Sequence, residues 1–214
     1  MIVIFATTNN RKLEDLNDII ANENLDLQVL SLSDIGWNRG EIEETGRTIQ
    51  ENSVLKAYAV LDFCRANNID YPIITDDAGL FVDALCGEPG IFTGRYADLD
   101  LMQNPELPKH YSIIKLLNKL VGEDNRTAEY RCAVTIMFST GEHLQFTERT
   151  EGWISETINE PIKKPYFYSL FVEGKTGKPF NQLSREELNS TYRFKALNKA
   201  LRYLGKRYQK NSTL

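Results

Sequence analysis

IVIFATTNNRK, residues 2–12, begins with four apolar residues and continues into a polar turn. The apolar run Ile2–Phe5 predicts a short buried strand, and apolar residues then recur at helical spacing from Leu13 to Ile20. A second apolar run at Leu27–Leu30 predicts another strand. A strand, a polar turn, a helix and a second strand in this order indicate the start of an α/β fold.

The rest of the chain extends this pattern over one domain, residues 1–214, with no internal repeat and no linker. Thr48 and Glu51 have the spacing of a capping box, so a helix is expected to begin there. Further elements are expected as helices over 49–67, 105–121 and 191–207, strands over 72–75 and 166–172, and an antiparallel hairpin over 129–139 and 142–150.

Composition and charge exclude several classes of protein. Apolar residues make up 42% of the chain and charged residues 26%, which is typical of a globular protein with a core and not of a fibrous or disordered chain. The net charge is −5, but Arg193–Lys210 carries seven basic residues and no acidic one, so the rest has a net charge of −12. This distribution argues against general nucleic-acid binding. It suits a metal site with a cationic wall facing an anionic small molecule, although a solvated basic helix explains the basic run as well.

The same sequence features bear on localisation. We expect neither a secretory signal nor a membrane span, because no apolar run approaches the roughly 20 residues that a span needs. Cys64, Cys86 and Cys132 are odd in number and form no CxxC pair, which predicts buried, reduced thiols in a cytoplasmic protein.

Two acidic clusters are candidates for chemistry. Glu41–Glu44 precedes the helix expected at residue 49, and Asp76 and Asp77 follow the strand expected at 72–75. Mg²⁺ prefers oxygen ligands and keeps several waters, so one carboxylate from each cluster would suffice to bind it. A second carboxylate could then take the proton from an attacking water. The alternative is a solvated acidic loop and an ordinary turn.

The polar turn Thr7–Lys12 is a candidate phosphate site, because it follows a strand and opens a helix. Backbone N–H groups and the dipole at a helix start favour phosphate oxygens, and Lys12 adds a positive charge. Capping of the helix by Asn9 or Asn10 would explain the same residues without any ligand.

Four groups of residues occur in order along the chain: Ala6-Thr7-Thr8-Asn9 with Lys12; Glu43-Glu44-Thr45-Gly46 with Glu51-Asn52 and Leu55-Lys56-Ala57; Asp76-Asp77-Ala78-Gly79-Leu80 with Val82-Asp83-Ala84-Leu85, Gly87, Pro89-Gly90 and Arg95-Tyr96; and Arg193 with Lys195-Ala196-Leu197. Together they resemble the inosine-triphosphate pyrophosphatase family, whose members remove nonstandard nucleoside triphosphates. The resemblance spans nearly the whole chain.

The resemblance implies an elongated, two-lobed α/β fold with a long mixed central sheet flanked by helices and a cleft between the lobes, usually as a homodimer. It also implies Mg²⁺-dependent hydrolysis of a nucleoside triphosphate to the monophosphate and pyrophosphate. By motif position, Asp77 corresponds to the general base and a metal contact, and Glu43 to the metal-binding acid, with Asp76 and Glu44 beside them. The phosphate contacts implied are Thr7, Thr8, Asn9, Asn10, Arg11, Lys12, Lys56 and Arg95.

The segment that would recognise the base departs from the family pattern. The family's Phe-Gly-Tyr/Trp-Asp aligns with Tyr166-Phe167-Tyr168-Ser169, its Ser after the paired aspartates is Ala78, and its Lys before the last helix is Leu188. Its Ser-His-Arg is Thr191-Tyr192-Arg193, which keeps the Arg alone. Losing polar groups that would pair with one base edge removes a basis for selecting that base. Tyr166, Phe167, Tyr168 and Tyr192 either stack on a base or belong to the core.

Two functions follow from these observations. The first is a Mg²⁺-dependent nucleoside triphosphate pyrophosphatase, acting on ITP- or XTP-type nucleotides with altered base specificity and needing no nucleic acid or membrane partner. The alternative is a nucleotide-binding sensor or scaffold with weak turnover. The enzyme is favoured because both acidic clusters and the cationic turn are retained together.

Overall fold

The computed structural model describes residues 1–211, where seven strands form one mixed sheet. The strands are β1 (Ile2–Phe5), β2 (Gln28–Leu30), β3 (Ile73–Val82), β4 (Pro89–Gly90), β5 (Thr127–Met137), β6 (His143–Ile154) and β7 (Phe171–Glu173). Their order in the sheet is β2-β1-β3-β5-β6-β7, and β4 pairs with β3. The sheet is mixed because β1 runs parallel to β2 and β3, whereas the β3–β4 and β6–β7 pairs are antiparallel.

The helices are short in the middle of the chain and long near its ends. The α-helices are α1 (Asn10–Asn22), α2 (Ile49–Ala66), α3 (Asp98–Gln103), α4 (Tyr111–Lys119), α5 (Arg185–Asn189) and α6 (Tyr192–Asn211). Four single 3₁₀ turns occur among the described residues: η1 (Asp83–Leu85), η2 (Thr93–Arg95), η3 (Tyr166–Ser169) and η4 (Phe180–Gln182). Residues 1–211 contain no helix that is both long enough and apolar enough to span a membrane.

By its internal contacts the chain divides into two compact units. The first comprises Met1–Asp77, Cys132–Glu148 and the chain from Arg193 onward, and the second comprises Ala78–Arg131 and Arg149–Tyr192. The boundaries fall within β3, β5 and β6, so these three strands contribute residues to both units.

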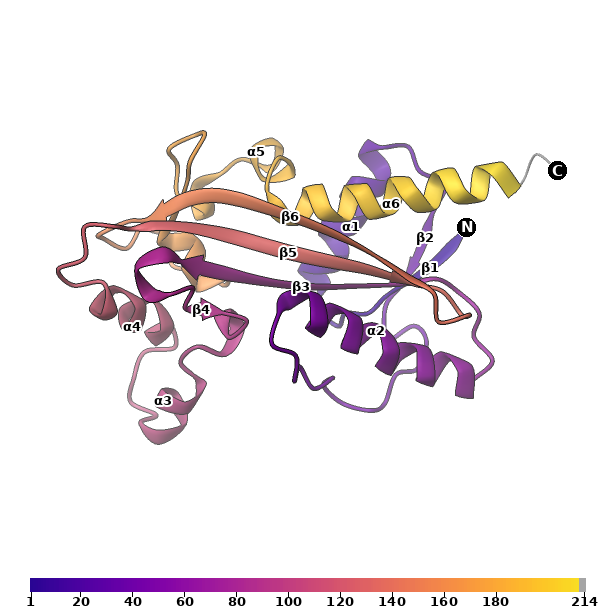
Figure 1. The fold of residues 1–214 in the computed structure, drawn as a ribbon, viewed down its shortest axis with the longest axis horizontal. Helices are drawn as coiled ribbons and strands as arrows, with labels where there is room; N and C mark the ends of the chain where they lie inside the picture. The colour runs from indigo at the N-terminus through magenta and orange to yellow at the C-terminus, as the bar shows by residue number, and fades with distance from the viewer. Residues whose placement is uncertain (212–214) are drawn as a thin grey trace. The chain divides into compact units, whose positions relative to one another are not determined.

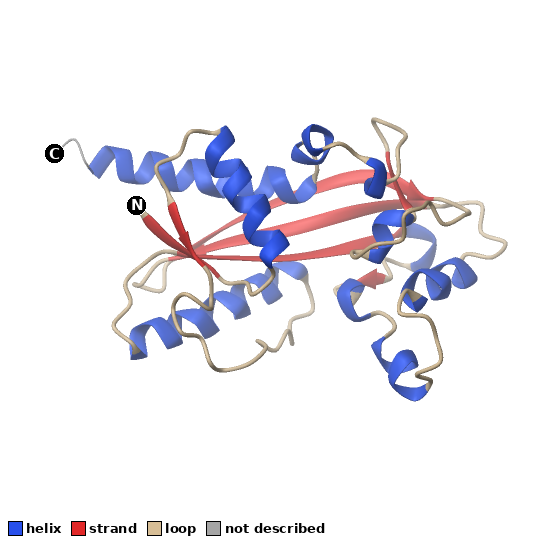
Figure 2. Cartoon of the chain, turned by 180° about the vertical axis from the view of Figure 1, so that it is seen from behind, coloured by secondary structure: helices blue, strands red, loops and turns tan. Residues whose placement is uncertain are grey.

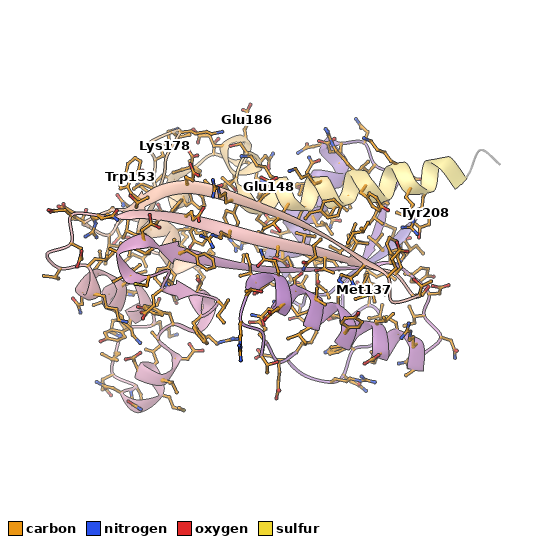
Figure 3. The ribbon with its side chains drawn as sticks, viewed as in Figure 1. Met137, Glu148, Trp153, Lys178, Glu186 and Tyr208 are labelled. Carbon is orange, nitrogen blue, oxygen red and sulfur yellow. The ribbon has the colours of Figure 1, made fainter. Side chains whose placement is uncertain are left out.

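In the first unit, helices cover both faces of the sheet. Helix α2 lies on one face, and α1 and α6 lie on the other, as the two opposite views show (Figures 1 and 2). Under α2, a core cluster includes Ile4, Val60 and Ile73, each 0% exposed, together with Met137 at the end of β5. Figure 3 labels Met137 on the α2 side of the hairpin and Glu148 on the α6 side, where Glu148 pairs with Lys199 of α6.

The second unit is held by aromatic packing and by close backbone contacts. Gly79 of β3 and Gly90 of β4 approach so closely that a Cβ on Gly79 would lie 2.4 Å from the Gly90 carbonyl oxygen. The Tyr130 ring stacks on Tyr192 with centroids 4.9 Å apart and on Phe180 with centroids 5.5 Å apart. These rings form the centre of the unit's apolar core.

Most of the expected elements are confirmed. The strands at both early apolar runs, the helix expected over 49–67, the hairpin and the last helix are all present, and the α/β fold with a mixed sheet flanked by helices is confirmed. Thr48 caps α2 by accepting a hydrogen bond from the Glu51 amide at 3.1 Å, as expected. Glu51 does not complete the capping box, because its carboxylate accepts from the Arg47 amide at 2.6 Å.

Three expectations of local structure were wrong. The strand predicted over 72–75 continues to Val82, so Asp76 and Asp77 lie within β3 and not in a turn. The helix predicted over 105–121 begins at Tyr111, because Pro105 and Pro108 disfavour helical backbone at the residues before them. The strand predicted over 166–172 starts as η3, whose turn is closed by the Tyr168 amide donating to the Pro165 carbonyl at 3.0 Å.

The cysteine prediction is confirmed for two residues of three. All three thiols are free; Cys64 and Cys132 are buried, and Cys86 is exposed. Burial raises the pKa of the Cys64 thiol to about 11 and that of Cys132 further, so neither forms a reactive thiolate near neutral pH.

Candidate active site

The start of α1 follows directly from the polar turn after β1. Asn9 is the N-cap: its side-chain oxygen accepts from the Arg11 amide at 3.1 Å, and its own amide donates to Thr7 Oγ1 at 3.1 Å. Thr7 is buried, whereas Thr8, Asn9, Asn10 and Arg11 are exposed. Capping by Asn9 is therefore confirmed, and phosphate binding at this exposed helix start stays a prediction.

Asp76 lies on the face of β3 that α1 and α6 cover. Both of its carboxylate oxygens accept hydrogen bonds from Lys12 Nζ, at 3.0 and 2.9 Å, and Arg193 Nε lies 3.4 Å from Oδ2. Arg193 also forms an ion pair with Asp15, at 3.6 Å. Burial alone would raise the pKa of Asp76, but the charges of Arg193, Lys12 and Lys56 outweigh it and hold that pKa far below its usual range.

Asp77 points to the opposite face, toward α2, because successive side chains of a strand alternate. Lys56 Nζ donates to Asp77 Oδ1 at 3.0 Å and also lies 2.5 Å from Glu44 Oε1. Asn52 Nδ2 donates to Asp77 Oδ2 at 3.3 Å. Burial raises the pKa of Asp77; Lys56 opposes this and Glu44 adds to it, so the pKa remains above its ordinary value.

One face of helix α2 carries the two residues that donate hydrogen bonds to Asp77. Asn52 and Lys56 are four residues apart, so they lie one above the other on the helix surface. Asn52 is 0% exposed, and its Oδ1 accepts from the Gly46 amide at 2.8 Å, which ties the acidic loop to the helix. A Cβ on Gly46 would lie 2.7 Å from that same Oδ1, so this close approach requires glycine.

The structure therefore separates the predicted acidic residues into two groups. Asp77 and Glu44 share Lys56, whereas Asp76 faces the other way and is paired with Lys12 and Arg193. Glu43, next to Glu44, is exposed. Within residues 1–211 no group of three or more His, Cys, Asp or Glu side chains is arranged to hold a metal ion. Metal contacts by Glu43, Glu44 and Asp77 stay predictions, and this geometry gives a contact by Asp76 no support.

The remaining candidate residues belong to the second unit and have neighbours of their own there. Ala78 is half-buried on β3, and the Arg95 guanidinium in η2 lies 5.5 Å from the centre of the Phe92 ring. Ser169 is 0% exposed and donates to the Tyr166 carbonyl at 2.7 Å. These contacts account for the residues without a ligand, so their contact with substrate stays a prediction.

The four aromatic residues proposed to stack on a base differ in exposure. Phe167 is 3% exposed and Tyr192 4%, so both are core residues of the second unit. Tyr166 and Tyr168 are half-buried, and the hydroxyl groups of Tyr168 and Tyr192 are 2.9 Å apart. The interpretation as core therefore describes Phe167 and Tyr192, and stacking on a base stays a prediction for Tyr166 and Tyr168.

Two buried polar residues of the first unit were missing from the sequence-based site. Asn52 bonds to Asp77, and Asp15 pairs with Arg193. A usable signal existed for Asn52, which precedes Lys56 by one helical turn and faces the same way. Asp15 follows Lys12 by three residues on α1, so a shared face could also have been anticipated.

Solved structures share the mixed α/β fold of this chain. The Staphylococcus aureus Ham1 protein is 30% identical in sequence, with a TM-score of 0.78 over 95% of this chain and 98% of that chain.

The family profile and the curated relatives agree. The profile of the Ham1 family matches residues 3–203, and the chain belongs to this family. A dITP/XTP pyrophosphatase of Leptospira interrogans is 33% identical over 201 residues, which is 93% of this chain and 94% of that protein. The dITP/XTP pyrophosphatase of Bacillus subtilis is 32% identical over 205 residues, which is 94% of this chain and 96% of that protein. The family resemblance drawn from the four sequence motifs is confirmed.

Proposed function

We propose that the protein is a nucleoside triphosphate pyrophosphatase that hydrolyses nonstandard purine nucleotides, of the dITP and XTP type, to the monophosphate and pyrophosphate. Family membership and the names of the curated relatives support this activity. The structural observation that carries it is Asp77, a buried carboxylate with a raised pKa, held between Asn52 and Lys56. A carboxylate whose pKa is raised is a stronger base than an ordinary one and is suited to accept a proton from water.

We propose that Mg²⁺ binds on the Asp77 face of β3, where the donor set fits it. Asp77 and Glu44 present carboxylate oxygens that already share one cation, the Lys56 ammonium group, at 3.0 and 2.5 Å. Glu43, which is exposed and directly precedes Glu44 in the family motif, is proposed as a further metal-binding acid from its motif position alone. Mg²⁺ is commonly held by one or two carboxylates together with substrate phosphates and water, so no larger protein cage is needed. Bound there, the ion would neutralise charge on the phosphate oxygens.

The chain's own residues would bind the triphosphate and orient the attacking water. Lys12 and Lys56 supply positive charge, and the start of α1 presents the exposed side chains of Thr8, Asn10 and Arg11. Arg95 is proposed as a further contact from its position in the family motif. Asp77 would accept the proton of the water that attacks the α-phosphate, while Asn52 and Lys56 hold its carboxylate in place.

The base specificity is proposed to differ in detail from that of the named relatives. Ser169 and Ala78 replace polar residues of the family pattern, and the Ser169 hydroxyl is already donated to a backbone carbonyl. Fewer side chains are therefore left to pair with a purine edge, which weakens discrimination against other bases. We also propose a cytoplasmic homodimer that acts without nucleic acid.

A panel of nucleoside triphosphates tests the activity. Purified protein would be incubated with Mg²⁺ and ITP, dITP, XTP or each common ribo- and deoxyribonucleotide, and the monophosphate and pyrophosphate would be separated by ion-exchange chromatography. We expect turnover of ITP, dITP and XTP, with measurable activity on other purines. Strict selection of the nonstandard purines would overturn the altered specificity alone. Calorimetric binding without pyrophosphate release from any nucleotide would favour the sensor or scaffold.

A further inference from the structure

A chain of buried hydroxyl groups joins α2 to the sheet of the first unit. Ser53, Thr75 and Thr135 are each 0% exposed. Ser53 Oγ lies 2.8 Å from Thr135 Oγ1 and 3.1 Å from Thr75 Oγ1, and Thr75 Oγ1 donates to the Ser53 carbonyl oxygen at 2.7 Å. At the outer end, Gln145 Nε2 donates to Thr135 Oγ1 at 3.1 Å and to the Gln50 carbonyl oxygen at 2.9 Å.

These hydrogen bonds form a directed chain when each hydroxyl proton is used once. Thr75 donates to the Ser53 carbonyl, so the bond between the two side chains is donated by Ser53. The Ser53 oxygen then accepts from Thr135, which in turn accepts from Gln145. Along this path, from β6 through β5 and α2 to β3, each hydroxyl donates once and accepts once. The Ser53 hydroxyl also lies 3.4 Å from the Thr75 carbonyl oxygen, a second and longer acceptor. Such a satisfied buried network specifies one arrangement of the elements that it joins.

The hydroxyl chain lies beside the N-terminal half of α2, where the apolar packing beneath the helix ends. The core cluster beneath the helix begins at Ala57 and continues with Val60, Leu61, Phe63 and Cys64. Apart from Ile49, the buried residues in the first two turns are the polar Asn52 and Ser53. Polar contacts therefore supply much of the specificity with which this half of α2 docks on the sheet.

This half of α2 also carries the residues that serve Asp77. Asn52 directly precedes Ser53, and Lys56 follows it by three residues. The bond from Asn52 to Asp77 is 3.3 Å, close to the upper limit for a hydrogen bond, so a small displacement of the helix would break it. At the β3 end of the hydroxyl chain, Thr75 directly precedes Asp76 and Asp77.

We propose that the hydroxyl chain Ser53–Thr75–Thr135 is a positioning element of the active site, which sets the register of α2 against β3 so that Asn52 and Lys56 meet Asp77. The role rests on the proposed hydrolase function, because that function makes Asp77 the reacting group. Removing the Thr135 hydroxyl leaves the buried Ser53 oxygen without the group that donates to it, and α2 is expected to shift to recover that hydrogen bond. Displacements of about 1 Å at a reacting group cost up to about 10²-fold in rate.

Thr135 gives the sharpest test, because its hydroxyl group bonds to Ser53 and Gln145 and to none of the proposed catalytic groups, and because two informative substitutions are possible there. Thr135→Val keeps the shape and removes the hydroxyl, whereas Thr135→Ser keeps the hydroxyl and removes a methyl group. We expect Thr135→Val to lower kcat by about tenfold with little change in KM, and Thr135→Ser to restore kcat toward the wild-type value. Val60→Ala, on the same helix but within the apolar cluster, is the matched control for lost stability and should leave kcat near wild type.

A crystal structure of each variant supplies a readout that does not depend on turnover. The separation of Lys56 Nζ and Asp77 Oδ1, 3.0 Å in the wild-type protein, should lengthen in Thr135→Val and stay unchanged in Thr135→Ser. An unshifted α2 in Thr135→Val, or equal loss of kcat in Thr135→Val and Val60→Ala, would overturn the positioning role. Absence of turnover in the wild-type protein would overturn the proposed function instead, and the crystal structures would still decide whether the hydroxyl chain positions α2.

Discussion

Asp76 and Asp77 are neighbours in sequence, yet they lie on opposite faces of β3 and their pKa values are shifted in opposite directions. On the α1 and α6 face, Asp76 has two cations, Lys12 and Arg193, and its pKa is strongly lowered although burial would raise it. On the α2 face, one lysine is shared between Asp77 and Glu44, and the pKa of Asp77 is raised, mainly by burial. Because Arg193 also pairs with Asp15, two cations face two carboxylates on the α1 and α6 face, whereas one cation faces two carboxylates on the α2 face.

The difference in charged partners suits the two carboxylates to different roles. A carboxylate with paired cations is held ionised and fixed, which suits a structural role and the positioning of Lys12. A carboxylate short of positive charge can accept a proton or attract a further cation, which suits chemistry. Adjacent titratable groups whose pKa values are pushed apart are a recurring sign of divided roles in active sites.

The largest expected effect is on turnover. Asp77→Asn removes the proposed base without changing its shape, so kcat should fall by roughly 10²- to 10⁴-fold while nucleotide binding survives. Lys56 keeps Glu44 as a partner, so folding should be retained. Steady-state kinetics and calorimetric nucleotide binding would measure both quantities. Asp62→Asn, an exposed aspartate on α2, is the control, and an active Asp77→Asn enzyme would remove Asp77 from the chemistry.

The second largest effect is expected on stability, at Asp76 on the α1 and α6 face of β3. Asp76→Asn leaves Lys12 and Arg193 with a neutral amide where each had a buried carboxylate, so the free energy of unfolding should fall by about 3–5 kcal/mol. Urea denaturation followed by circular dichroism would measure it. Asp62→Asn should change stability by no more than about 0.5 kcal/mol. A similarly small change in Asp76→Asn would show that the cations on this face do not depend on its charge.

The pH dependence of stability should have opposite signs on the two faces. The lowered pKa of Asp76 gives stability that is present above the unfolded value of about 3.9 and is lost as the pH falls further. The advantage of wild type over Asp76→Asn should therefore shrink below about pH 4. The raised pKa of Asp77 makes the wild-type protein lose stability as the pH rises through that pKa. The free energy of unfolding of Asp77→Asn should therefore increase relative to that of wild type toward neutral pH.

Urea denaturation without divalent metal, from about pH 3 to about pH 7, would give both curves. Curves of the same sign for the two variants would contradict the division between the faces.

Sequence patterns predicted elements whose apolar spacing is regular and missed those whose order depends on distant partners. Helices α2 and α6 and the hairpin carry clear periodicity, so their positions could be predicted. The length of β3 could not, because Asp76 and Asp77 resemble a turn in isolation. They are tolerated inside a strand only because cations from α1, α2 and α6 meet them there.

The sequence identified charged residues of the candidate site that lie together, but it did not indicate how they are arranged. The family motifs brought together Lys12, Lys56 and the paired aspartates, which the structure places in the first unit. They did not indicate that Asp76 and Asp77 serve opposite faces, although strand alternation would have implied it had residues 76 and 77 been assigned to a strand. Asn52 was missed because its partners, Asp77 and Gly46, are set by the docking of α2 and not by local sequence.

The smallest expected effect concerns the start of α2, which supports the Asp77 face alone. Thr48→Ala removes the side-chain oxygen that accepts from the Glu51 amide, so the free energy of unfolding should fall by about 1 kcal/mol. Thr48→Ser retains that acceptor and serves as the control. Because Lys56 lies two turns further along the helix and is fixed by Asp77 and Glu44, kcat should stay near wild type. A large loss of kcat in Thr48→Ala would show that the helix end, and not the buried contacts beneath it, controls the geometry at Asp77.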